Sequence, residues 1–241
     1  MPDAPRWLQG RVAVVTGASS GIGRATAEAI AAVGAHVVLA ARRGPALMAV
    51  AETIRASGGQ ATPAPTDVRE PADVDRLFSI AAEAGDPTVL ICAAAVLTSV
   101  PFEQTTMQTW TETMATNLTG MFLCCRAAFE PMRKAGGGRI INIASLSGVY
   151  GTEKFPGLAA YNVSKYGVIG LTEAISLEGR DHRISAVCLS PGAVDTDMLR
   201  RANPSLKAGL TPADVGALIV QLLDQPMAAM SGANIPLYSN R

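Results

Sequence analysis

Short apolar runs alternate along the chain with longer stretches in which apolar residues recur at helical spacing. The apolar runs are VAVVT at 12–16, HVVLA at 36–40, TVLICA at 88–93, RIINIA at 139–144, ISAVCLS at 184–190 and ANIPLY at 233–238, with a weaker run at 61–66. The helical patterns occupy 21–33, 45–57, 71–84, 109–134, 160–179 and 212–223. Strands this apolar are typical of parallel sheets covered by helices on both faces. The pattern therefore predicts an α/β fold with one doubly wound parallel sheet of about seven strands.

Polar and glycine-rich segments follow the predicted strands at their carboxyl ends. TGASSGIG follows the first strand, ARR the second, TDV the third, CAAA the fourth, SLSG the fifth and PGAVDTD the sixth. Ligands of open parallel sheets bind beyond these ends, so we expect the segments to meet at one site. The chain shows no repeat or linker, and we expect residues 1–241 to form one domain.

Composition narrows the possible ligands. Hydrophobic residues make up 49% of the chain and the formal net charge is zero, with no basic block, which argues against nucleic acid as a partner. No apolar run reaches the roughly 20 residues of a membrane span, and MPDAPRWLQG lacks the apolar core of a signal peptide. The cysteines and the two histidines lack metal-ligand spacing, so we expect no metal and buried thiols in a reducing cytoplasm.

The segment TGASSGIG, at 16–23, has the composition of a phosphate-binding turn. Glycine permits positive φ and close backbone approach, and the N–H groups of a following helix suit a phosphate. No G-K-[ST] follows, which excludes a P-loop, and a turn that merely packs small residues is the alternative. The glycine spacing also differs from the common G-x-G-x-x-G fingerprint.

With this T-G-x-x-x-G-x-G spacing the sequence resembles the short-chain dehydrogenase/reductase family, from Gly10 to about Tyr238. The resemblance implies a Rossmann-type fold, an NAD(P) cofactor and a homodimer or homotetramer. It assigns cofactor contacts in the glycine loop to Gly17, Ser19, Ser20, Gly21, Ile22 and Gly23. Further contacts fall on Asp67, Val68, Ala93, Ala94, Pro191, Gly192, Val194 and Thr196.

The end of the second strand favours NADP over NAD. An acidic residue at this position binds the adenosine ribose, whereas an arginine accommodates a 2′-phosphate. Ala41 stands in place of the acid, and Arg42 and Arg43 follow it. A guanidinium beside a phosphate makes a charge-assisted contact. Solvated surface arginines are the alternative.

Two segments depart from the family pattern or allow a second interpretation. CAAA at 92–95 stands where the family usually has N-N-A-G, and SGANIPLYSNR replaces the frequent V-D-G-G ending. The resemblance places the side chain of Asp67 and the N–H of Val68 against the adenine. Asp67 or Thr66 could instead cap the following helix.

The segment AAYNVSK carries the candidate chemistry. Tyr161 and Lys165 are four positions apart, so both side chains project from one helix face. A nearby ammonium favours the phenolate and lowers the tyrosine pKa toward the working pH. The resemblance adds Ser145 as the hydroxyl that binds the carbonyl oxygen and Asn117 as the residue that holds a water near the lysine. Ser147 is a weaker candidate for that hydroxyl.

These residues predict an NADPH-dependent reductase of ketones, in which Tyr161 is the general acid or base. The same site could oxidise secondary alcohols. A non-catalytic NADP-binding sensor or scaffold is the alternative from another class. Thr196 is expected at the nicotinamide carboxamide, and residues 198–210 are expected to cover the substrate. We expect the pocket to be lined by Val96, Leu97, Leu146, Tyr150, Phe155, Ala193 and Met198.

Overall fold

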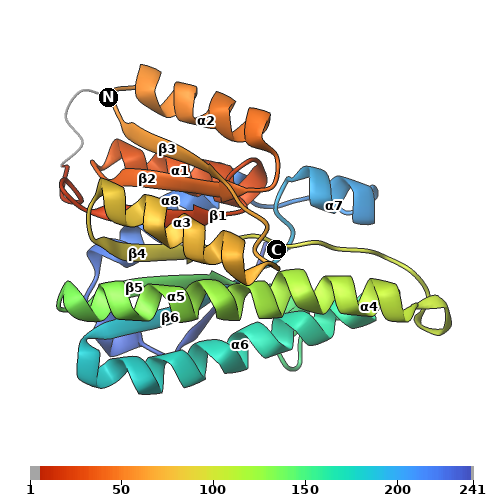
Figure 1. Cartoon of the computed structure of the whole chain (residues 1–241). Helices are drawn as coiled ribbons and strands as arrows, with labels where there is room; N and C mark the ends of the chain where they lie inside the picture. The colour runs from red at the N-terminus through yellow and green to blue at the C-terminus, as the bar shows by residue number, and fades with distance from the viewer. Residues whose placement is uncertain (1–5, 240–241) are drawn as a thin grey trace.

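The computed structural model describes residues 6–239, which are organised around one seven-stranded parallel sheet (Figure 1). The strands are β1 Val12–Thr16, β2 His36–Ala41, β3 Gln60–Pro65, β4 Pro87–Cys92, β5 Gly138–Ile143, β6 Ile184–Pro191 and β7 Asn234–Leu237. Their order is β3-β2-β1-β4-β5-β6-β7, and every neighbouring pair is parallel. The predicted doubly wound sheet is therefore confirmed, including the weaker strand and the last one.

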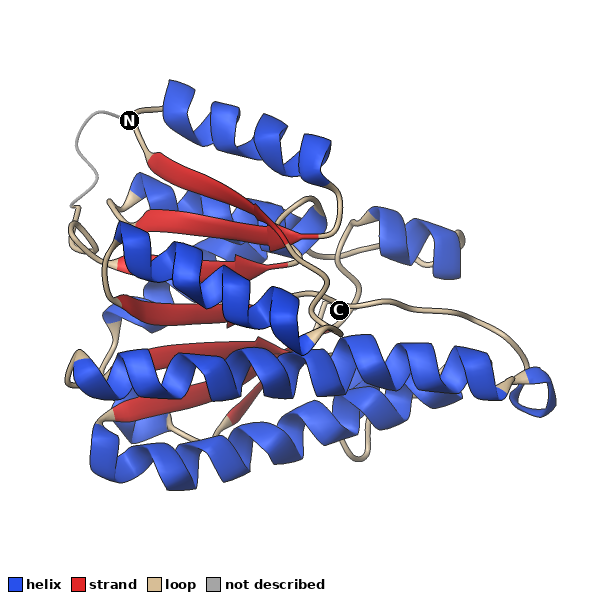
Figure 2. Ribbon diagram, in the orientation of Figure 1, coloured by secondary structure: helices blue, strands red, loops and turns tan. Residues whose placement is uncertain are grey.

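Helices cover both faces of the sheet, as Figure 2 shows. One face carries α1 Gly21–Ala32, α2 Gly44–Ala56 and α8 Pro212–Asp224, and the other carries α3 Pro71–Ala84, α5 Gly120–Lys134 and α6 Ala159–Gly179. Alternate residues of each strand pack into the two cores. Val15 and Ile91 face the first group of helices, whereas Val14 and Leu90 face the second. This two-sided burial explains why the central strands β1, β4 and β6 are mostly apolar.

The helical pattern predicted at 109–134 forms three joined segments. They are α4 Met107–Met114, the π-helical turn η2 Ala115–Thr119 and α5, which continue one another in Figure 1. A π-turn inside an α-helix is rare and occurs mostly at functional sites. It falls here on Asn117.

The remaining elements are short. They are the 3₁₀ turns η1 Phe102–Gln104, η3 Leu146–Gly148, η4 Arg180–His182 and η5 Met227–Met230, and the helix α7 Asp197–Ala202. Figure 1 shows that α7 stands beyond the carboxyl ends of the strands, clear of both helical layers. No helix within residues 6–239 is long and apolar enough to cross a membrane.

Candidate active site

A cleft of about 1290 Å³ lies at the carboxyl ends of the strands. The chain reverses its direction of winding between β1 and β4, and this switch point is where open α/β sheets bind ligands. Within residues 6–239, all of the predicted cofactor and catalytic residues line the cleft except Asn117. The six segments expected to meet at one site do so.

The glycine loop forms the floor of the cleft beside β4. Gly17 and Gly21 have φ values of +68° and +55°, which side chains rarely adopt. A Cβ on Gly17 would lie 2.7 Å from the carbonyl oxygen of Ala93, and one on Gly23 would overlap the Gly17 carbonyl. No side chain caps α1 at Ser20 in the described structure, so the first-turn N–H groups stay available to an anion.

Arg43 joins the end of β2 to the glycine loop. Its Nη2 donates to the hydroxyls of Ser19 at 3.2 Å and Ser20 at 3.4 Å. Arg42 and Arg43 are both exposed residues that line the cleft. This corner therefore presents the Arg43 guanidinium and two hydroxyls, and Arg42 lines the same cleft.

Asp67, which lines the same cleft, is paired with Arg69. Arg69 Nη2 lies 2.6 Å from Asp67 Oδ2, and Arg69 Nε lies 2.9 Å from Oδ1. These bonds are the main cause that lowers the pKa of Asp67, so its carboxylate is held ionised.

The capping interpretation of Asp67 and Thr66 is wrong. α3 has Glu70 at its N-cap position, without a side-chain cap. The Thr66 hydroxyl donates back to Ala64 O, and the Asp67 N–H donates to Asp73 Oδ2 at 2.9 Å. Neither side chain accepts from the first turn of α3.

Thr16 supports the segment that departs from the family pattern. Its buried hydroxyl accepts hydrogen bonds from the N–H groups of Ala93 at 3.1 Å and Ala94 at 3.2 Å. The chain therefore turns out of β4 without an asparagine side chain at either position. The backbone of this turn lies close to Gly17, because a Cβ on Gly17 would come within 2.8 Å of Ala93 C and Ala94 N.

Asn117 is fully buried behind the cleft. Its Oδ1 accepts from Val96 N at 2.8 Å, and its Nδ2 donates to Val96 O at 2.9 Å and to Ser164 Oγ at 3.1 Å. The side chain thus clamps the chain after β4 from both sides. The π-turn brings Asn117 into this position.

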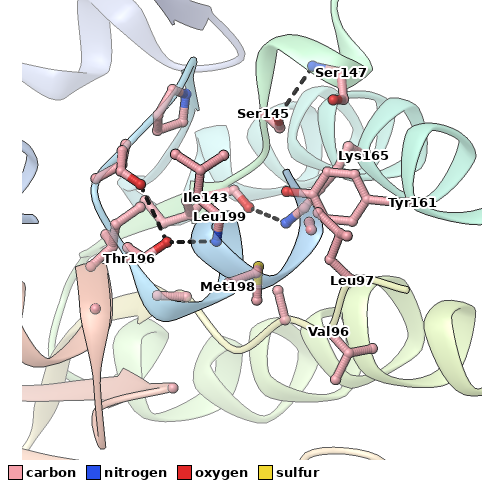
Figure 3. Close-up of a pocket in the computed structure, with 18 of the residues that line it drawn as sticks. Val96, Leu97, Ile143, Ser145, Ser147, Tyr161, Lys165, Thr196, Met198 and Leu199 are labelled. Carbon is pink, nitrogen blue, oxygen red and sulfur yellow. Dashed lines mark hydrogen bonds between the residues drawn. The ribbon is translucent and has the colours of Figure 1, made fainter. Parts of the chain in front are cut away.

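Tyr161 and Lys165 project from α6 into the cleft (Figure 3). Lys165 is almost completely buried, and its Nζ donates to Ile143 O at 2.8 Å. The same Nζ lies 5.5 Å from the centre of the Tyr161 ring. Ser145, at the end of β5, also lines the cleft, and its Oγ accepts from Ser147 N at 3.1 Å.

Burial moves both pKa values away from their ordinary range. It lowers the pKa of Lys165 to about 8 and raises that of Tyr161, while the Ser145 hydroxyl lowers the Tyr161 pKa in opposition. The expectation that Tyr161 titrates below its ordinary value therefore finds no support in this geometry, because desolvation outweighs the hydrogen bond.

The opposite wall is the turn after β6. Gly192 N donates to Leu237 O at 2.9 Å, and Ala193 N donates to Ser239 Oγ at 2.7 Å. Thr196 caps α7 by accepting from Leu199 N at 3.2 Å. A Cβ on Gly21 would lie 3.3 Å from Thr196 Cγ2, so Thr196 stands directly over the glycine loop.

The cleft contains every residue expected to line the substrate pocket except one. Val96, Leu97, Leu146, Phe155, Ala193 and Met198 all line it. Tyr150 does not, because its side chain is 93% exposed. Residues Asp197–Ala202 form α7, whose Met198 and Leu199 line the same cleft as Tyr161. Figure 3 labels all three.

Sequence reasoning assigned no individual role to several residues with clear structural roles. Thr16 and Ser164 lie within the motifs, but they bond to partners on other elements, and Arg69 bonds to Asp67 within a loop. Their residue types are ordinary for a strand end, a helix and a turn. A contact between positions 16 and 93 becomes visible only when β1 and β4 pair.

A glycine loop at the switch point of a parallel sheet, with Ser, Tyr and Lys in the same cleft, defines a dinucleotide-dependent oxidoreductase site. A family model described as short chain dehydrogenase matches residues 11–207. The chain belongs to the short-chain dehydrogenase family, whose members are oxidoreductases acting on CH–OH or carbonyl groups.

Named relatives agree with this assignment. A 3-oxoacyl-[acyl-carrier-protein] reductase of Synechocystis is 35% identical over 232 residues, which are 92% of each chain. Glycine betaine reductase of Emericella nidulans is 35% identical over 237 residues, which are 94% of this chain but 18% of that protein.

A solved structure has the same fold. The 3-oxoacyl (acyl-carrier-protein) reductase of Agrobacterium tumefaciens, with NADP bound, superposes with a TM-score of 0.87 at 26% identity. The superposition covers 98% of this chain and 96% of that one.

Proposed function

We propose that the protein is an NADPH-dependent oxidoreductase that interconverts a ketone and a secondary alcohol, with Tyr161 as general acid and base. The observation that carries the proposal is the convergence of Ser145, Tyr161 and Lys165 in a cleft that also contains the glycine loop. Residues 1–241 would then form one domain that holds both cofactor and catalytic groups.

The cleft fits a dinucleotide. Its floor is glycine backbone at two positions where a Cβ would collide, and the uncapped start of α1 faces it. Its volume exceeds that of most single-ligand pockets, so cofactor and substrate can share it. In this proposal Val68 and Asp67 meet the adenine, Ala93 and Ala94 the ribose, and Val194 and Thr196 the carboxamide.

The catalytic roles follow from the positions of the side chains. When bound, the nicotinamide supplies the hydride. The Ser145 hydroxyl donates a hydrogen bond to the substrate carbonyl oxygen, where negative charge develops. Tyr161 gives its proton to the same oxygen. Lys165 keeps two N–H groups beyond the one on Ile143 O, which suit ribose hydroxyls.

Asn117 acts through Val96 in this proposal. Its side chain holds the backbone at the head of the substrate wall rather than facing the cleft. The carbonyl substrate is expected to be moderately apolar, because Val96, Leu97 and Phe155 line its half of the cleft.

NADP is favoured by the corner built from Arg42, Arg43, Ser19 and Ser20. These groups offer charged and neutral donors, as a 2′-phosphate requires.

Titration of cofactor fluorescence tests the choice of NADP over NAD. We expect Arg43→Ala to weaken NADPH binding by about 10-fold or more and NADH binding by less than about twofold. Arg24→Ala is the control, because Arg24 pairs with Glu28 on the exposed side of α1. Equal weakening of both cofactors would contradict NADP selectivity.

A screen of ketones for NADPH oxidation tests the function. Turnover of an apolar ketone is the expected result. Tight NADPH binding without turnover of any ketone, or of any secondary alcohol with NADP, would favour the non-catalytic sensor.

We also propose that α5 and α6 join two copies of the chain. Phe122 on α5 and Val163, Tyr166 and Leu177 on α6 are apolar yet 40–64% exposed. The spacing of the three α6 residues places them on one helix face. Light scattering tests this interface. We expect Leu177→Glu to give monomers and the control Glu178→Gln to stay a dimer. An unchanged dimer in both variants would contradict the interface.

The four buried free cysteines support a cytoplasmic setting.

A further inference from the structure

The loop between Ser145 and Tyr161 contains a lysine that none of the roles above uses. Lys154 is partly buried, and its ammonium donates to Leu146 O at 3.0 Å, Val149 O at 2.5 Å and Thr152 Oγ1 at 2.6 Å. An ammonium has three N–H donors, so all three have an acceptor.

The direct partners of this ammonium are uncharged oxygen atoms. No carboxylate pairs with Lys154 within residues 6–239, and the Tyr166 ring lies 5.3 Å from its Nζ. Hydrogen bonds from a charged donor are stronger than neutral ones, and a cation over an aromatic face adds to them. The loop thus contains a charged clamp built from backbone carbonyls.

The carbonyls that Lys154 holds belong to the turn that carries Ser145. Ser145 is the N-cap of η3, and Val149 N donates to Leu146 O at 3.0 Å at the end of this turn. The Thr152 hydroxyl lies 2.6 Å from Leu146 O and 2.9 Å from Val149 O, within the same cluster. Lys154 therefore joins both ends of the turn to the loop.

The same turn is packed tightly on α6. A Cβ on Gly148 would lie 2.5 Å from the carbonyl carbon and oxygen of Lys165. Any displacement of η3 therefore changes the position of Ser145 relative to Tyr161 and Lys165. Lys154 itself does not line the cleft, whereas its neighbours Thr152, Glu153 and Phe155 do.

We propose that Lys154 is a positioning residue, whose ammonium fixes the Ser145 turn against α6 and so sets the Ser145 hydroxyl for proton transfer by Tyr161. This inference rests on the proposed function. It makes the loop between Ser145 and Tyr161 an active part of the site.

A double-mutant cycle on kcat tests the proposal. Lys154→Met keeps the length of the side chain and removes its donors. We expect kcat to fall about 10- to 100-fold, because a small misplacement of a catalytic group has effects of this size, while the Kd of NADPH changes by less than about twofold. In a Ser145→Ala background the same substitution should lower kcat by less than about twofold, since the group it positions is gone.

A merely structural role gives another pattern. Lys154→Met would then lower the unfolding temperature and change kcat equally in both backgrounds, which would overturn the proposal. Lys134→Met, at the exposed end of α5, is the control and should match wild type. Should Lys154→Met fail to fold, Thr152→Val removes the shared hydroxyl and should show the same coupling to Ser145.

Amide hydrogen exchange separates this proposal from the function on which it rests. We expect the exchange of residues 146–149 to rise at least about 10-fold in Lys154→Met. Unchanged exchange would overturn the clamp even in an active enzyme. If exchange is faster in Lys154→Met but the wild-type protein turns over no ketone or alcohol, the hydrogen-bonding role of Lys154 stands. Its catalytic purpose and the proposed function are then overturned.

Discussion

Thr16→Val tests what supports the chain after β4, where CAAA stands in place of the N-N-A-G segment expected from the family resemblance. Valine has nearly the same shape as threonine, so the substitution removes one hydroxyl without opening a cavity. That hydroxyl accepts from the N–H groups of Ala93 and Ala94 at 3.1 and 3.2 Å. Both N–H groups would lose their protein partner.

The expected cost follows from these two bonds. A net hydrogen bond contributes about 1 kcal/mol, and a buried donor left unpaired costs about 1–3 kcal/mol. Ala93 and Ala94 are half-buried, so water can reach them in part. We therefore expect the free energy of unfolding to fall by about 2 kcal/mol, which corresponds to about 4–8 °C in Tm for a chain of this size.

Urea unfolding of Thr16→Val and Thr88→Val measures the effect against a matched control. Thr88 lies on β4 and is equally buried, but its hydroxyl has no hydrogen-bond partner among the described residues. Thr88→Val should be neutral or stabilising. Because Gly17 touches Ala93, Thr16→Val should also weaken NADPH binding. If Thr16→Val were no more destabilising than Thr88→Val, the proposed support of β4 would be refuted.

Two further predictions concern the glycine loop and the buried lysine. Gly23→Ala places a Cβ on the Gly17 carbonyl and should raise the Kd of NADPH by about 10-fold or more, whereas Gly170→Ala, with nothing within 4 Å, should leave it unchanged. Equal affinities of both variants would contradict the close approach. Burial lowers the pKa of Lys165 from 10.5 to about 8, so between these pH values the unfolded chain holds more protons than the folded protein. The free energy of unfolding should therefore rise with pH across this window by about 1 kcal/mol per unit relative to Lys165→Met. The same pH dependence of urea unfolding in both proteins would exclude Lys165 as its cause.

Periodicity sufficed for the sheet because burial on both faces leaves a strong local signal. VAVVT and ISAVCLS are mostly apolar, and both are buried strands with helices on each side. The π-turn could not be predicted in the same way. Residues 115–119 continue the helical pattern of their neighbours. A π-turn contains one more residue than an α-helical turn, but it requires no particular residue type and so leaves no sequence signal.

The positions of the candidate site residues could be predicted where those residues belong to a recognisable sequence motif. Ser145, Tyr161 and Lys165 line one cleft because β5 ends, and α6 begins, at the same edge of the sheet. Tyr150 was placed wrongly, because a loop has no periodicity that tells which side chain turns inward. The Asp67–Arg69 pair and the Lys154 clamp depend on local backbone geometry that residue types alone do not specify.

The pKa of Tyr161 could not be predicted from the sequence either. The sequence places an ammonium four residues away and suggests a lowered pKa. The folded protein buries both groups, and the desolvation of Tyr161 acts in the opposite direction. The depth of burial was the quantity that could not be read from spacing.

Single-turnover reduction of a ketone by wild type and Tyr161→Phe decides whether Tyr161 supplies the proton in an NADPH-dependent reduction. We expect loss of at least about 99% of the rate, a contribution typical of a general acid, with the Kd of NADPH within about twofold of wild type. Retention of a tenth or more of the rate would contradict it and assign the proton to another group.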